Sequence, residues 1–328
     1  MNGKRKFNLI IRGGYMHTFF PVIQKDELLF SIYARYHERS LNKSENKTIK
    51  ELHLTKINPL LPENIQCLIY KLKYFDAPDI DYFLNIHTMY NYISNFISPT
   101  DIKELYQYMT KGTGKIGAHV SDKHFSQKKY LKYCPDCIQK DFELLGETHW
   151  RLSHQLPTLF VCMIHEIPLK QIDTPNNDIG LNTIIIHQQN NIPCEPLTKK
   201  TLFYAKQFAK QSYYLNKMNF NLYNKIQSQD FYRLFIERGF VSDSVVHEKK
   251  LDKEIVSFFG SEFLELAGFN QEIFKEISIR PLFFSNSMTP IEILVLINFF
   301  YKSLSGIVLH KNSSKRGLGQ SLLAELLV

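Results

Sequence analysis

The spacing of apolar residues predicts helices along most of the chain. In residues 26–40 apolar side chains recur at intervals of three and four, and charged residues occupy the opposite face. The apolar positions are Leu29, Ile32, Tyr33 and Tyr36. After a polar break, residues 48–54 form a second, shorter helical segment. Residues 26–54 therefore have the outline of a helix-turn-helix unit.

Capping and turn residues locate further elements. The Ser-Pro-Thr-Asp run at residues 98–101 predicts a helix start, and the Thr-Pro-Ile-Glu run at residues 289–292 has the form of a capping box. Gly239 predicts a helix end. A short apolar run at residues 183–187 predicts a strand, and the Asn- and Pro-rich residues 188–196 predict a domain boundary.

Composition narrows the class of protein. The 328 residues carry a net charge of +8. A secreted disulfide scaffold would have more cysteines and an even number of them, whereas this chain has five. The longest apolar stretch, residues 293–301, is interrupted by Asn298 and is well short of the roughly 20 residues of a membrane helix. No secretory leader is visible. We therefore expect a cytoplasmic protein with no membrane partner.

The basic N-terminus has two interpretations. Arg12, Gly13 and Gly14 precede Met16 closely, and Arg-Gly-Gly codons can spell a purine-rich ribosome-binding site. One hypothesis is that translation starts at Met16 and that residues 1–15 are not made. The alternative is a disordered basic arm.

Four residues have the spacing of a metal site. Cys134 and Cys137 are separated by two residues, Cys162 and His165 are also separated by two, and 24 residues lie between the pairs. A two-residue spacer lets both side chains of a tight turn reach one ion, and Zn²⁺ prefers four N or S ligands in a tetrahedron. Four protein ligands leave no position for water, so the pattern predicts one structural Zn²⁺ and no catalytic residue.

Two other interpretations of these cysteines are buried free thiols and a redox pair. A redox pair at Cys134 and Cys137 leaves Cys162 and His165 without a role. Cys67 and Cys194 have no partner at ligand spacing, so we interpret them as ordinary core or loop residues.

The segment between the two pairs is rich in histidine and holds the chain's single tryptophan. We interpret Trp150, Arg151 and His154 as outer partners of the metal ligands or as packing within the module. His149 and His154 also suggest an alternative function of another class, in which the protein is a zinc-stapled nuclease of the HNH type. The Asn and the second metal-side His of such a nuclease are absent in register.

These patterns predict a mainly α-helical protein. The expected parts are a basic leader (1–15), a helical N-terminal domain with the helix-turn-helix-like segment (16–125), a zinc-finger module (126–172), a short strand and linker (173–200), and a helical C-terminal domain (201–328).

Basic residues gather in places suited to phosphate contacts, the salt-sensitive part of nucleic-acid affinity. The candidates for DNA binding are Arg35, Arg39, Lys43, Lys47, Lys50, Lys311, Lys315 and Arg316. The alternative for each patch is a solvated helix face.

A longer set of residues around the metal ligands forms a specific signature. Its members are residues 130–137 (YLKYCPDC), Asp141, Gly146, Glu147, Trp150, Arg151, residues 154–157 (HQLP), Val161, Cys162 and residues 165–169. Together they resemble the signature of the TniQ/TnsD family, the target-selection proteins of Tn-seven-like bacterial transposons. Further similar segments are residues 19–21, 26–29, 34–37, 87–88 and 289–300, so the likeness covers most of residues 17–305.

This resemblance implies a non-catalytic, nucleoid-associated bacterial adaptor. Such proteins bind double-stranded target DNA and recruit an AAA+ regulator ATPase that brings the transposase. The alternative within the family is an adaptor to an RNA-guided CRISPR effector complex. The family's zinc ligands correspond to Cys134, Cys137, Cys162 and His165, and its helix-turn-helix to residues 26–54. TnsD proteins usually continue into further DNA-binding modules, so we expect a chain ending at Val328 to be either a fragment or a short member.

Overall fold

The computed structural model describes residues 19–54, 57–72, 78–113, 130–175, 178–183, 196–218, 220–226, 228–242, 245–269 and 288–307. The basic leader and Met16 lie outside these ranges. So does the strand expected at residues 183–187, apart from Thr183, which is not in a strand.

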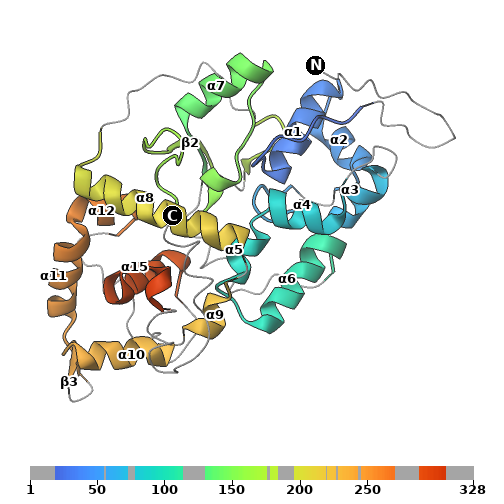
Figure 1. Cartoon of the computed structure of the whole chain (residues 1–328). Coiled ribbons are helices and arrows are strands. Elements are labelled where there is room, and N and C mark those ends of the chain that lie inside the picture. Colours follow the sequence, from blue (N-terminus) through green and yellow to red (C-terminus); the bar gives the residue numbers. More distant parts are fainter. Residues whose placement is uncertain are drawn as a thin grey trace.

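The N-terminal part is helical (Figure 1). Its helices are α1 (Leu29–Arg39), α2 (Glu45–Glu51), α3 (Ile65–Leu72), α4 (Ile80–His87), α5 (Tyr90–Ser94) and α6 (Pro99–Lys111). The predicted start of α6 is confirmed, because the Ser98 hydroxyl accepts a hydrogen bond from the Asp101 amide at 3.1 Å. The predicted apolar face of α1 is also buried, but burial extends around nearly the whole helix and includes Arg35.

The central part is built on a two-stranded ribbon. Strands β1 (Tyr130–Tyr133) and β2 (Lys170–Pro175) pair antiparallel, with Lys132 opposite Gln171 and Tyr133 opposite Lys170. Helix α7 (Pro135–Leu145) follows β1 directly and ends at Gly146, whose positive φ of 72° suits a glycine. A short 3-10 turn, Ser153–Gln155, lies between α7 and β2.

The C-terminal part is again helical. Its elements are α8 (Lys199–Lys217), α9 (Leu222–Lys225), α10 (Ser228–Glu237), β3 (Val241–Ser242), β4 (Val245–Val246), α11 (Glu248–Phe259), α12 (Ser261–Leu266) and α15 (Pro290–Tyr301). The predicted capping box of α15 is confirmed, with reciprocal hydrogen bonds between Thr289 and Glu292. Gly239, two residues beyond α10, has a φ of 67°.

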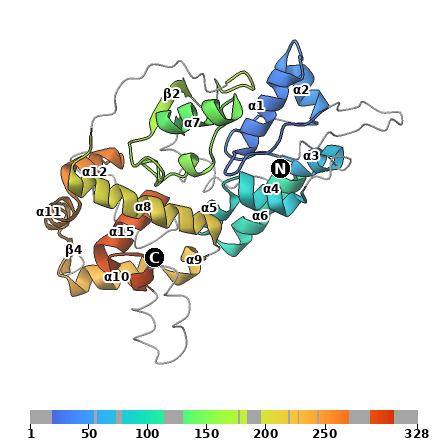
Figure 2. The same cartoon turned by 45° about the horizontal axis from the view of Figure 1, so that its top comes forward.

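The three parts share one apolar core. Buried residues from α1, from the central part and from α15 belong to a single contiguous cluster, represented by Leu29, Trp150 and Leu294. Helix α8 crosses the molecule between the central ribbon and the C-terminal helices, and it contacts both α5 and α12 (Figures 1 and 2). The expectation of a mainly helical fold is confirmed. Within the described ranges, the helices are all too short or too polar to cross a bilayer.

Candidate metal centre

The first pair of ligands lies where the β ribbon passes into a helix. Cys134 directly follows β1, has an extended conformation and occupies the N-cap position of α7. Pro135 begins the helix, as its fixed φ favours, and Cys137 follows in the first turn. Because the chain turns sharply between strand and helix, both thiols lie on the inner side of the turn, where they are buried.

The second pair is carried by a tight loop that leads into β2. The Cys162 amide donates to the Ile167 carbonyl at 2.8 Å, and the Glu166 amide donates to the Cys162 carbonyl at 2.8 Å. Glu166 takes the left-handed conformation, with φ of 56°, that closes the loop. A bridge between Val161 and Pro168 fixes the loop's base.

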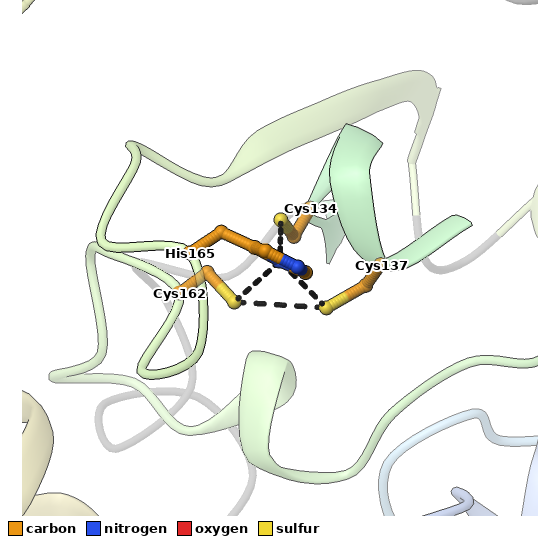
Figure 3. A group of neighbouring side chains, drawn as sticks. All are labelled: Cys134, Cys137, Cys162 and His165. Carbon is orange, nitrogen blue, oxygen red and sulfur yellow. Dashed lines mark hydrogen bonds between the residues drawn. The ribbon is translucent and has the colours of Figure 1, made fainter. Parts of the chain in front are cut away.

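The pairing of β1 with β2 brings the two pairs together. Figure 3 shows the four side chains pointing toward a common centre. The separations are 3.4 Å from His165 Nδ1 to the sulfur of Cys134 and to that of Cys137, and 3.7 Å to that of Cys162. The sulfurs of Cys137 and Cys162 are 3.6 Å apart, and all four ligand atoms lie within 4.8 Å of one another. We call these four residues the Cys₃His cluster.

These separations fit a tetrahedral ion. With Zn–S near 2.3 Å and Zn–N near 2.0–2.1 Å, a tetrahedron places two sulfurs about 3.8 Å apart and a sulfur and a nitrogen about 3.5 Å apart. The observed separations of 3.4 to 3.7 Å match both values. The cluster can therefore hold one metal ion with four protein ligands.

Protons are shared unequally among the three thiols. Hydrogen bonds to Cys134 and Cys162, together with burial, raise the pKa of Cys137. Hydrogen bonds from Cys134 and Cys137 lower the pKa of Cys162. Without a cation the cluster thus favours one thiolate supported by neighbouring thiols, and a metal would bind by displacing the remaining protons.

The three residues predicted to pack around the ligands all lie in the module. His154 is buried and hydrogen-bonds the Cys162 sulfur, which helps to lower the pKa of that thiol. Arg151 donates to Asp141 Oδ1 at 2.5 Å. The Trp150 indole donates to the Thr183 carbonyl at 3.1 Å, and its side chain is 1% exposed.

The histidines of the nuclease interpretation are both buried, His149 at 6% and His154 at 4% exposure. His149 Nδ1 lies 3.3 Å from Asp141 Oδ2 without forming a hydrogen bond. Burial, with a smaller contribution from the positive charge of Arg151, lowers the pKa of His149 to about 3. A phosphodiester cannot approach side chains buried to this extent, which disfavours a nuclease.

Residues 130–169, which carry the Cys₃His cluster and which we call the metal module, are joined to α1 by a network that the sequence did not predict. Arg35 is 2% exposed and donates to both oxygens of Glu27, at 3.0 and 2.9 Å. Its other terminal nitrogen donates to Glu147, beyond the end of α7. Arg39 binds the second oxygen of Glu147 at 2.6 Å. We call Glu27, Arg35, Arg39 and Glu147 the ion network.

Backbone hydrogen bonds reinforce the same contact. The Leu28 amide donates to the Trp150 carbonyl at 2.7 Å, and the Leu152 amide donates to the Asp26 carbonyl at 2.6 Å. The Trp150 amide donates to the Ser31 hydroxyl at 3.0 Å. The N-terminal helical part and the metal module are therefore joined edge to edge.

The expected contact of Arg35 with DNA does not fit the structure, because the guanidinium is buried and binds Glu27 and Glu147. A signal for this role is present in the sequence: Arg35 lies four residues after Ser31 and seven after Leu28, on the buried face of α1. A charge at such a position indicates a buried partner.

The other candidates for DNA binding are placed differently. Arg39, Lys43, Lys47 and Lys50 are exposed, on and around the turn between α1 and α2. Lys311, Lys315 and Arg316 lie outside the described residues.

The TniQ family model matches residues 18–169, a segment that contains the whole Cys₃His cluster and the ion network. The resemblance to the TniQ/TnsD family is thereby confirmed. In a comparison with curated proteins, no sequence matched the chain.

Proposed function

Since residues 18–169 form a TniQ domain, a domain of transposition-associated target selectors, we propose that the protein selects a target site for a transposon. In this proposal it is a non-catalytic adaptor of the bacterial nucleoid that binds double-stranded target DNA and recruits an AAA+ regulator ATPase. The observation that carries the proposal is the match of the TniQ family model to residues 18–169, because these residues include both the Cys₃His cluster and the contact with α1.

In the proposal the Cys₃His cluster holds one structural Zn²⁺. Three sulfurs and one imidazole nitrogen form a donor set that suits zinc, and the four of them complete a tetrahedron. When bound, the ion would cross-link the two loops and stabilise them against unfolding. Because the residues that hold α1, Glu147, Trp150 and Leu152, lie in the segment between these two loops, the metal would also help to fix the position of the N-terminal helices.

The proposed DNA-binding surface is the outward side of α2 and the turn before it. Lys43, Lys47 and Lys50 are exposed there. The Lys47 ammonium lies 4.0 Å from the Glu51 carboxylate, and its side chain is 63% exposed, so it remains largely solvated. Arg39 adjoins them, but its bond to Glu147 makes it a weaker candidate for phosphate contact.

The orientation of α2 is fixed by polar contacts on both the buried and the exposed side of the helix. His37 Nδ1 lies 2.7 Å from the hydroxyl of Thr48, which is fully buried on the inner side of α2. Glu45 accepts hydrogen bonds from the amide and the side chain of Asn182 at 2.9 and 2.8 Å. A helix held in this way presents its lysines in a fixed direction, as phosphate binding requires.

A first experiment measures duplex binding by fluorescence anisotropy at several salt concentrations, together with the zinc content of the purified protein. We expect one zinc per chain and an affinity that falls steeply with salt. Lys47→Ala and Lys50→Ala should each lower the slope of log affinity against log salt by about one. Lys103→Ala, an exposed lysine on α6, is the matched control and should leave the slope unchanged.

Recruitment is tested by adding an AAA+ regulator ATPase of a Tn-seven-like transposon and following co-elution on DNA. Binding of the ATPase and the duplex supports the target selector. Binding to a CRISPR effector complex without duplex binding would favour the RNA-guided adaptor, and metal-dependent cleavage of the duplex would overturn the adaptor function altogether.

A further inference from the structure

The outward face of α8 combines lysines with exposed aromatic rings. The helix is 19 residues long, and its solvent-facing positions recur at intervals of three and four. Six exposed or partly exposed positions have this spacing: Lys199, Phe203, Lys206, Lys210, Tyr213 and Lys217. Lys200 is exposed as well, but its ammonium donates to the Ser257 carbonyl at 2.8 Å. We call the six residues the α8 stripe. Because each residue adds 1.5 Å, the stripe is about 27 Å long.

The stripe is strongly basic. Helix α8 contains five lysines and no acidic residue. Lys206 pairs with Glu166 at 2.5 Å, whereas Lys199, Lys210 and Lys217 have no acidic partner within the described ranges. The nearby Glu262 accepts hydrogen bonds from Thr198 and Thr201 instead.

Helix stability does not explain these charges. Lys199 stands in the first turn, where a positive charge opposes the helix dipole. Lys206 and Lys210 are four residues apart, a spacing at which like charges repel. The helix is held by its opposite side, where Ala205, Phe208 and Leu215 are fully buried.

Two aromatic rings lie among the lysines. Phe203 is 61% exposed and Tyr213 is 39% exposed, whereas the next residues along the helix, Tyr204 and Tyr214, are partly buried against the core. The ammonium of Lys217 lies 5.5 Å from the centre of the Tyr213 ring. The two rings are ten residues apart, or about 15 Å along the helix, with Lys206 and Lys210 between them.

We propose that the α8 stripe binds single-stranded DNA. Lysines that follow a phosphate backbone, interleaved with exposed rings on which unpaired bases stack, are the features of single-strand binding surfaces. A duplex offers no free base face to Phe203 and Tyr213. A membrane requires a continuous apolar face, which the intervening lysines interrupt. The choice of DNA over RNA rests on the proposed function in transposition, whereas the single-strand site itself does not depend on the α2 surface.

The test is fluorescence anisotropy with an oligothymidylate of about 16 nucleotides, at the upper end of the length that one such site covers. The duplex of equal length, a uridylate of equal length and vesicles containing phosphatidylserine are measured in parallel. We expect the full chain to bind the single-stranded DNA. Phe203→Ala and Tyr213→Ala should each weaken this binding at least about fivefold and leave duplex binding unchanged.

Lys210→Glu with Lys217→Glu should weaken single-strand binding further and reduce its salt dependence. The matched controls are Tyr70→Ala, a ring of similar exposure on α3, and Lys249→Glu on α11. The four substituted positions of the stripe are exposed, and circular dichroism checks that each variant is folded. Duplex binding by the α2 variants that equals that of the wild type would overturn only the proposed target surface and would leave the single-strand site untouched.

The proposal is overturned if the wild-type chain does not bind the oligothymidylate, or if the ring variants bind it as well as the wild type. It is also overturned if the stripe variants lose binding to vesicles or to the uridylate but not to single-stranded DNA.

Discussion

The contact between α1 and the metal module differs in kind from the packing of the C-terminal helices. The first is held by directed polar groups: the ion network and the backbone bonds at Leu28 and Leu152. The second is held by aromatic rings, with centroids such as those of Phe208 and Phe263 only 5.0 Å apart. Directed bonds tolerate one arrangement, whereas ring packing tolerates several. The difference indicates that the relative position of α1 and the module is set closely.

The largest effect is expected from loss of the metal. Cys134→Ser or Cys162→Ser should abolish zinc binding and unfold the module, because a structural site contributes on the order of 10 kcal/mol. Elemental analysis and hydrogen exchange check this, with exchange rising also in α1. Cys67→Ser, a half-buried cysteine outside the cluster, is the control. A wild-type protein that is folded but free of metal would contradict the prediction.

The next effect separates the buried part of the ion network from its exposed part. Arg35→Ala should lower the free energy of unfolding by about 3 to 5 kcal/mol, because it leaves Glu27 buried without its partner. Arg39→Ala removes a half-exposed arginine from the same Glu147 and should cost less than about 1 kcal/mol. Chemical denaturation measures both. Equal losses would show that burial does not distinguish the two arginines.

Ring packing should be more forgiving. Phe263 contacts Phe208 and Phe259 in the C-terminal core, and Phe263→Leu keeps an apolar side chain of similar volume there. We expect a loss of about 1.5 kcal/mol in denaturant unfolding. If this loss equalled that of Arg35→Ala, the contrast between the two regions would fail.

The last effect is absent at neutral pH and appears only in acid. The folded-state pKa of His149 is lowered to about 3 by burial, so below its ordinary value near 6.5 the unfolded chain binds a proton that the folded chain does not. Stability from this group is therefore complete above about pH 6.5 and is lost as the pH falls, by up to about 1.4 kcal/mol per pH unit. His149→Gln should flatten the pH dependence between pH 6.5 and 5. An unchanged slope would argue against a neutral buried imidazole.

Features set by neighbouring residues were predictable from the sequence. The α6 start at Ser98, the capping box at Thr289 and the two ligand pairs each depend on side chains within three positions of one another. Their geometry follows from local backbone conformation alone. The mainly helical fold followed from apolar spacing in the same way.

Features that depend on residues far apart in the chain were not predictable from the sequence. The acids that surround Arg35 are eight and 112 residues away from it, so its pattern on the helix gave no partner. The β1–β2 ribbon was missed because each strand is short and its pairing depends on the loop that carries Cys162 and His165. The region of α8 was predicted only as part of a helical C-terminal domain, and the arrangement of its lysines on one face emerged once burial separated that face from the other.

The edge-to-edge bonds at Leu28 and Leu152 have a consequence for synthesis of the chain. Their partners are more than 120 positions away in sequence, so α1 cannot reach its final place until the module has been made. Contacts of such long sequence separation fold slowly. The ribosome adds about 5 to 20 residues per second, so the apolar face of α1 would stay uncovered for several seconds during each round of translation. Over that interval the newly made N-terminus is exposed to aggregation and to chaperones.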